Sequence, residues 1–286
     1  MRRIIQSLIQ NVVQPIAFVI FSTSAIAQNN SLPDSLRIGL VPNVSTHILM
    51  QNYAPLKNFF LAQGFKQVTL ISADNFKDFN DRTKAQEFDL IVTAPHMARL
   101  AQMDYKYEPL VAMTPNIKAL MIVATDGQAS TEQLKNANIA FANPQSLVAM
   151  IGNKWLANKA MQPNIDYTPV TVPREDNIGN LILEGRAKFG ILSNAELRAI
   201  PERLQSKLKV IEVLADIPNF IILSNANYSQ NQNLQLKSLF KKFSDPNQFS
   251  DQFFTLTGFT SMRPVSESQM KSLDAYLAQT RSALSQ

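Results

Sequence analysis

The residues of this 286-residue chain that could do chemistry are polar side chains at predicted turns, and they do not form a catalytic set. The chain has no cysteine and only two histidines, His47 and His96. Without cysteine it offers no thiolate nucleophile and no thiolate metal ligand. An isolated imidazole suits a hydrogen bond to a polar or anionic group better than a metal site, which needs further ligands. We therefore expect no metal and no cofactor.

The stretch NIAFANPQSLVAM, residues 138–150, leads from a short apolar run through a polar turn into a helical pattern. The first N–H groups of a helix have no acceptor within the helix, and they carry a partial positive charge. A helix start can therefore hold an anion or a polar group. This turn predicts a ligand contact by Asn143, Gln145 and Ser146. Ordinary helix capping by the same residue types is the alternative.

Two more turns follow predicted strands in the first half of the chain. In open α/β sheets, ligands lie beyond the carboxyl ends of strands. We therefore expect both turns to line a cleft, although residues of these types also cap helices where no ligand is present. The candidate residues are Asn43, Ser45, Thr46 and His47 in the first turn, and Pro95, His96 and Met97 in the second. In REDN, residues 174–177, Arg174 could pair with an anion or take part in a helix cap.

The elements that must position these turns alternate between short apolar runs and helical patterns, which is typical of βαβ units. Strands are expected at residues 36–42, 67–73, 89–95, 107–114 and 118–125, with helices after the first three. The turn-rich DGQAS follows, and the alternation then starts again. Amphipathic helices are expected at residues 233–245 and 266–284. This pattern predicts an α/β fold with a first lobe of residues 34–125 and 221–286, a second lobe of residues 126–220, and a cleft and hinge between them.

The N-terminus has the pattern of a secretory signal peptide, residues 1–27. Arg2 and Arg3 precede a mostly apolar stretch, and Ala25-Ile26-Ala27 is a small-x-small cleavage site. The apolar stretch is too short and too interrupted for a membrane span. Because no cysteine is available for lipid attachment, we expect a periplasmic protein without a lipid anchor. The chain has 27 basic and 22 acidic residues, and removing Arg2 and Arg3 leaves a charge of 25 − 22 = +3, too small to indicate nucleic acid.

Taken in order, several motifs resemble those of the phosphonate-type periplasmic solute-binding proteins of ABC transporters. They are the opening strand IGLVP, the helix YAPLKNFF, the strand DLIVTAP, the strand YEPL and the stretch LKNANIAFANPQS. The resemblance implies a type II fold in which each lobe has a mostly parallel sheet flanked by helices. It also implies hinge closure on a small anionic or oxyanion-bearing solute, and delivery of that solute to an ABC permease in the inner membrane. We expect a monomer.

The resemblance also marks departures from the family pattern. The family carries a Ser-Thr-Ser run at the phosphonate-binding turn, whereas the matching residues here are Ser146, Leu147 and Val148. A family histidine of the second lobe falls near Arg174 and Glu175, which are therefore candidate ligand contacts. The loss of two hydroxyls favours a ligand with a smaller anionic demand or a larger apolar part.

Three other functions are compatible with such a fold. A sensor kinase in the membrane could replace the permease as the partner. An enzyme on the same fold, for instance one acting on a cofactor precursor, would need a nucleophile with a base in reach, and the chain has no cysteine and no G-x-S-x-G motif. A protein-interaction module that has lost its ligand is the third alternative. We expect a binding protein and not an enzyme.

Overall fold

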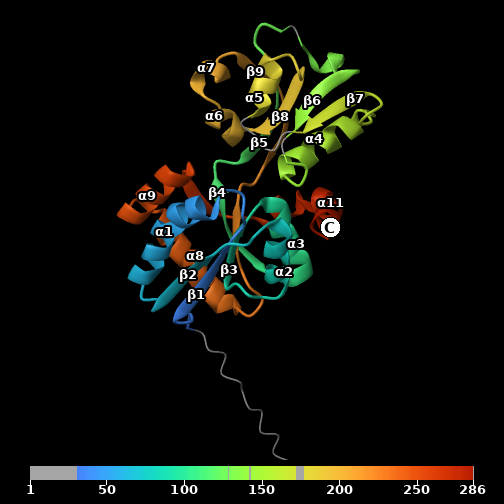
Figure 1. Cartoon of the computed structure of the whole chain (residues 1–286). Coiled ribbons are helices and arrows are strands. Elements are labelled where there is room, and N and C mark those ends of the chain that lie inside the picture. Colours follow the sequence, from blue (N-terminus) through green and yellow to red (C-terminus); the bar gives the residue numbers. More distant parts are fainter. Residues whose placement is uncertain (1–30, 128, 142, 172–176, 286) are drawn as a thin grey trace, which may run out of the picture.

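The computed structural model describes residues 31–127, 129–141, 143–171 and 177–285. The expected signal peptide, residues 1–27, lies outside this range, as do Arg174 and Glu175. None of the helices in the described part is long and apolar enough to cross a membrane. Two sheets, each with helices packed against it, form two lobes that lie one above the other in Figure 1 and are joined by extended segments.

The sheet of the first lobe has six strands in the order β11-β4-β10-β3-β1-β2. β1 pairs in parallel with both β2 and β3, whereas β10 and β11 pair with their neighbours in the antiparallel direction. The sheet is therefore mixed and not mostly parallel as the resemblance implied, since two of its five strand pairings are parallel and three are antiparallel. Its strands are β1 (Ser35–Leu40), β2 (Gln67–Ile71), β3 (Leu90–Thr93), β4 (Glu108–Thr114), β10 (Ile221–Ser224) and β11 (Ser261–Pro264).

Eight helical segments belong to this part of the chain. One side of the sheet is covered by an aromatic core in which helix α1 meets α8 and α9. Edge-to-face ring pairs join Phe59 to Phe243 at 5.1 Å and Phe60 to Phe240 at 5.5 Å between ring centroids, and this geometry is the favourable one for aromatic rings. The segments are α1 (Thr46–Ala62), α2 (Phe76–Lys84), α3 (Pro95–Tyr105), α8 (Gln230–Ser244), α9 (Gln248–Thr257), α10 (Glu267–Lys271), η2 (Asp274–Tyr276) and α11 (Leu277–Leu284).

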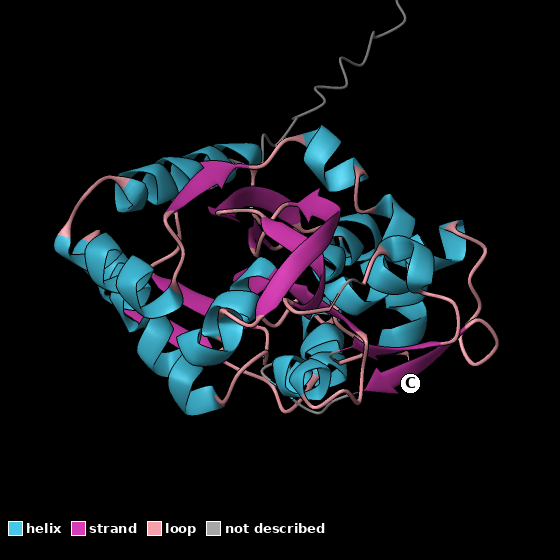
Figure 2. Ribbon diagram, turned by 90° about the horizontal axis from the view of Figure 1, so that it is seen from above, coloured by secondary structure: helices cyan, strands magenta, loops and turns pink. Residues whose placement is uncertain are grey.

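The sheet of the second lobe has five strands in the order β7-β6-β8-β5-β9. β6 is parallel to β7 and β8, and β5 is antiparallel to β8 and β9. Helices lie around this sheet as well (Figure 2). The strands are β5 (Ile117–Ala124), β6 (Ala137–Phe141), β7 (Tyr167–Thr171), β8 (Phe189–Ser193) and β9 (Leu208–Ile217), and the helices are η1 (Thr131–Gln133), α4 (Leu147–Asn158), α5 (Asn177–Leu183), α6 (Asn194–Ala199) and α7 (Glu202–Gln205).

The chain changes sheets earlier than the sequence pattern predicted. β4 belongs to the first sheet and β5 to the second, so the crossing lies at Pro115 and Asn116 and not near residue 125. The two apolar runs follow each other closely and have the same character, so their pattern alone does not separate them into two lobes. The chain returns between β9 and β10, and β10 begins at Ile221.

Candidate functional site

The two expected turns of the first lobe lie side by side. β1 and β3 are parallel neighbours, and the N–H of Val41 donates to the carbonyl of Val92 at 3.1 Å where the two strands end. The segments that follow, residues 43–47 and 94–97, therefore start at the same edge of the sheet. This edge is the carboxyl end at which α/β folds place their ligands.

Helix α1 begins at this edge with its first turn open to solvent. Its N-cap residue Ser45 makes no side-chain cap hydrogen bond. The other three residues that the sequence singled out in this turn, Asn43, Thr46 and His47, are exposed, as is Ser45. The first N–H groups of α1 have no acceptor within the helix, so they are available to a ligand together with the Ser45 and Thr46 hydroxyls.

The end of β3 holds two buried polar atoms without a partner. Thr93 is fully buried, and no hydrogen bond satisfies its Oγ1. His96, on the first turn of α3, is 5% exposed, and its Nδ1 also lacks a partner. An unsatisfied buried polar group costs about 1–3 kcal/mol, so two such residues three positions apart make this end of β3 a candidate site.

Burial also sets the charge of His96. Desolvation lowers the pKa of its imidazole to about 4, and a hydrogen bond with the backbone of Gln145 opposes this shift. The imidazole is therefore neutral at neutral pH, and it can donate through one nitrogen and accept through the other. Its neighbours Pro95 and Met97 are buried, and Met97 belongs to the apolar core.

The turn of the second lobe is held by its own hydrogen bonds. The side-chain oxygen of Asn143 accepts from the N–H of Gln145 at 2.9 Å, and the carbonyl of Asn143 accepts from the N–H of Ser146 at 2.8 Å. Ser146 is the N-cap of α4, and its Oγ accepts from the N–H of Ala149 at 3.2 Å. The Ser146 oxygen thus caps the helix, as the alternative interpretation predicts. Its hydroxyl proton takes no part in this hydrogen bond.

The structure brings one pair of the expected residues together across the lobes. The backbone of Gln145 contacts His96, so the first turns of α4 and α3 meet. The Gln145 side chain points elsewhere, because its Nε2 donates to the carbonyl of Ala283 on α11 at 3.3 Å. Arg174 and Glu175 cannot be placed, since they lie outside the described residues. In the part of the chain that the structure describes, no three His, Cys, Asp or Glu side chains gather as a metal site would require.

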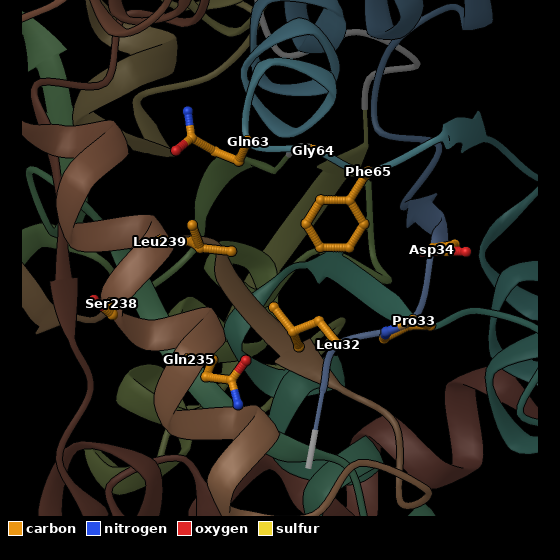
Figure 3. Close-up of a pocket in the computed structure, with 9 residues that line it drawn as sticks. All are labelled: Leu32, Pro33, Asp34, Gln63, Gly64, Phe65, Gln235, Ser238 and Leu239. Atoms are coloured by element: carbon orange, nitrogen blue, oxygen red, sulfur yellow. The ribbon is translucent and has the colours of Figure 1, made fainter. Parts of the chain in front are cut away.

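One cavity lies away from these turns. It has a volume of about 400 Å³ and is formed at the amino end of β1, where α1 ends and α8 passes. Leu32, Phe65 and Leu239 point toward this hollow in Figure 3. The cavity contains none of the residues that the sequence singled out, and it lies at the opposite end of β1 from them.

One residue of the site was missed by sequence reasoning, namely Thr93. Its signal was available, because it is the one polar residue in the run LIVTA that leads directly into α3. The C-terminal helix α11 was also expected only as an amphipathic helix, with no relation to the ligand turn. Sequence periodicity gave its apolar face but not the surface that it covers.

The fold is that of a known class of protein. Residues 38–270 match the model of the family described as "ABC transporter, phosphonate, periplasmic substrate-binding protein". The chain therefore belongs to this family of periplasmic proteins, whose role is to bind the substrate of an importer. Membership implies a small-molecule ligand and a membrane permease as partner, and the family is one of transporter binding proteins and not of enzymes.

Solved structures share the two-lobe fold at low sequence identity. XAC2383 from Xanthomonas citri, bound to chloride, has a TM-score of 0.73 at 14% identity, over 88% of this chain and 100% of its own. PhnD1 from Prochlorococcus marinus, in complex with methylphosphonate, has a TM-score of 0.70 at 12% identity, over 87% and 99% of the two chains. A binding protein component of a phosphonate transporter from Pseudomonas aeruginosa follows with 0.66 at 15% identity, over 87% and 88%.

Proposed function

We propose that this protein captures a small anionic or oxyanion-bearing solute between its lobes and delivers it to an ABC permease in the inner membrane. The observation that carries the proposal is the pair of unpartnered buried atoms, Thr93 Oγ1 and His96 Nδ1, beside the open first turn of α1. The Thr93 hydroxyl and the free helix N–H groups are donors, whereas Nδ1 of the neutral His96 is an acceptor, because the one N–H of the ring is engaged with the Gln145 backbone. A protonated oxyanion, with anionic oxygens and one O–H, offers a partner to each of these groups.

The donors at this place are neutral. Segments 43–47, 93–97 and 143–146 contain no lysine and no arginine, and His96 is uncharged at neutral pH because burial lowers its pKa to about 4. A doubly charged group would receive little compensation for its lost hydration there. The arrangement therefore favours a solute with a single negative charge, or with a polar group of lower charge, over a phosphonate dianion.

The two apolar residues in the family's hydroxyl positions, Leu147 and Val148, belong to the apolar core. They offer a ligand no hydrogen-bond donor where the family pattern has two hydroxyls. This supports the lower anionic demand that the sequence suggested.

We propose that the lobes close about two crossing segments that are fastened together. Asn219 Nδ2 donates to the carbonyl of Pro115 at 2.7 Å, and Asn116 Nδ2 donates to the Asp216 carboxylate at 2.7 Å. These bonds join the outgoing and returning segments, so that they act as one hinge. A solute that contacts both lobes would stabilise the closed arrangement by its higher affinity for it. On this division the second lobe runs from Ile117 to Ile217.

We also propose that the chain is exported by its N-terminal segment, works as a monomer without a lipid anchor, and catalyses no reaction. A permease and not a sensor kinase is the partner that family membership supports. No thiolate is available, and the Thr93 hydroxyl makes no hydrogen bond to the His96 imidazole, the contact that a base and its nucleophile would share. The neutral imidazole of His96 instead serves as a hydrogen-bonding group.

The test is to identify the solute that the protein carries. The protein is purified from the periplasm of its own cells under mild conditions, and native mass spectrometry compares its mass before and after unfolding. We expect one small anionic compound, which then binds the refolded protein in isothermal titration calorimetry. Methylphosphonate and a short alkanesulfonate serve as defined probes in parallel. A protein that carries no compound and shows no binding heat with any anion would contradict the proposal.

A further inference from the structure

The C-terminal segment, residues 266–285, lies against both lobes. After β11 the chain leaves the first sheet and forms α10, η2 and α11. In Figure 1, α11 lies beside α3 of the first lobe and below α4 of the second. The segment is thus a connection between the lobes in addition to the two crossing segments at the hinge.

Ion pairs fasten this segment to helix α3. The Nε of Arg99 lies 2.6 Å from a carboxylate oxygen of Asp274, and the Arg99 side chain is only 4% exposed. Arg281 holds Asp104 with two hydrogen bonds, at 2.8 and 2.7 Å. Two-pronged contacts between guanidinium and carboxylate groups have strict geometry, and they are among the stronger polar contacts in proteins.

The contacts with helix α4 and with the turn that leads into it are of a weaker kind. Gln145 Nε2 donates to the carbonyl of Ala283 at 3.3 Å. Lys154 Nζ donates to the carbonyl of Ala275 at 3.4 Å, and it also lies 5.3 Å from the centre of the Tyr276 ring. These bonds are longer than the ion pairs, and no carboxylate takes part in them. The segment should therefore stay with α3 when the lobes separate, and the contacts with α4 should break.

Apolar packing continues across the same three helices. Leu277 and Leu284 of α11 are 9% and 6% exposed, and they belong to one apolar cluster with Met97 of α3 and with Met150 and Ile151 of α4. The Thr280 hydroxyl lies 4.0 Å from the sulfur of Met150. On this side of the molecule the lobes are joined by a shared core, so separation there would expose apolar side chains to water.

We infer that the C-terminal segment is a third connection between the lobes, which is fixed to α3 by ion pairs and is released from α4 on opening. Through its contact with Gln145 the segment also positions the ligand-binding turn. The role of Gln145 in positioning the ligand-binding turn rests on the proposed solute site. The connection between the lobes does not depend on that site. The side chain of Gln145 is hydrogen-bonded to α11, while its backbone contacts His96. Loosening α11 should therefore change both the separation of the lobes and the order of the first turn of α4.

The connection is tested by the distance between spin labels on the two lobes. The chain has no cysteine, so Asn58→Cys on α1 and Glu202→Cys on α7 give one exposed label site on each lobe. The double variant Gln145→Ala/Lys154→Ala removes both polar contacts with α4. The matched control Asn158→Ala/Lys159→Ala changes two exposed polar residues at the far end of the same helix, where Lys159 contacts the Trp155 ring.

We compare the population of molecules with a long label distance with the population that has a short one, without added ligand. We expect the double variant to raise this population ratio at least fivefold, because the loss of one hydrogen bond costs about 1 kcal/mol. The control should match the unmodified protein. Hydrogen exchange at the amides of residues 145–149 should also become faster in the double variant and not in the control. A distance distribution and exchange rates equal to those of the unmodified protein would overturn the inference.

A second pair of variants addresses the side that faces the first lobe. Arg281→Glu places like charges beside Asp104 and should lengthen the label distance, whereas Arg281→Glu/Asp104→Arg restores opposite charges and should return it. If neither change moves the distance, the ion pair does not fix the segment and the inference fails. The distance measurement needs no ligand. If the variants change the label distance as expected but the protein carries no solute, the proposed function is contradicted and the inference on the C-terminal segment is not.

Discussion

Protonation of His96 should be a main cause of acid instability in this protein. The imidazole is buried between α3 and the first turn of α4, and burial lowers its pKa from 6.5 to about 4. Between these two values the unfolded chain binds a proton that the folded chain does not bind. The free energy of unfolding must therefore fall as the pH falls through this window, and the contribution of His96 is fully present above it.

The size of the effect follows from the same pKa. Each pH unit between the two pKa values corresponds to about 1.4 kcal/mol. At pH 4 the loss relative to pH 7 is then about 3 kcal/mol from this one group, a large part of the stability of a typical protein. Carboxylates also titrate in this range, so the contribution of His96 has to be measured as a difference between variants.

The assay is urea unfolding at several values between pH 7 and pH 4. His96→Asn keeps a polar side chain but cannot be protonated, so its free energy of unfolding should fall about 3 kcal/mol less over this range than that of the unmodified protein. His47→Asn is the matched control, since it changes the other histidine, which is exposed. Parallel pH profiles for His96→Asn and the unmodified protein would refute the reasoning.

Three further substitutions have defined outcomes. Ser146→Ala removes the cap of α4 and should lower the free energy of unfolding by about 1 kcal/mol, measured by urea unfolding; an unchanged value would show that the cap is not formed in solution. Thr93→Val removes an unpartnered buried hydroxyl, so thermal unfolding without ligand should occur at an equal or higher temperature, and a clear fall would mean that the hydroxyl has a partner. Gly39→Ala places a Cβ 2.6 Å from the Phe88 ring and should cost about 1–3 kcal/mol in the same assay, whereas a neutral result would mean that the ring can move.

Much of the fold could be predicted because strands and helices leave local patterns. The expected strands at residues 67–73 and 107–114 correspond to β2 and β4, and the helix start at the ligand turn corresponds to α4. The change of sheet could not be predicted in the same way. Periodicity identifies a strand but not its pairing partner, and β4 and β5 are both buried apolar runs separated by two residues.

The position of the candidate turns was predictable from residue types. Polar turns beyond β1 and β3 were expected, and the structure places them at one edge of the sheet. The state of His96 was not predictable, since its burial depends on contact with a turn almost 50 residues later in the chain. The expected helix at residues 266–284 is divided into α10, η2 and α11, and its position against two lobes depends on ion pairs that no local pattern reveals.

The central claim, that a solute completes the unpartnered groups at the end of β3, is tested most directly by the affinity of the carried solute for two threonine variants. Thr93→Val should weaken binding at least tenfold in calorimetry, as expected for a lost hydrogen bond to a charged group, without loss of stability. Thr83→Val removes a buried hydroxyl that donates to the carbonyl of Phe79 at 2.7 Å, so it should lower stability and leave the affinity unchanged. An affinity of Thr93→Val equal to that of the unmodified protein would contradict the account.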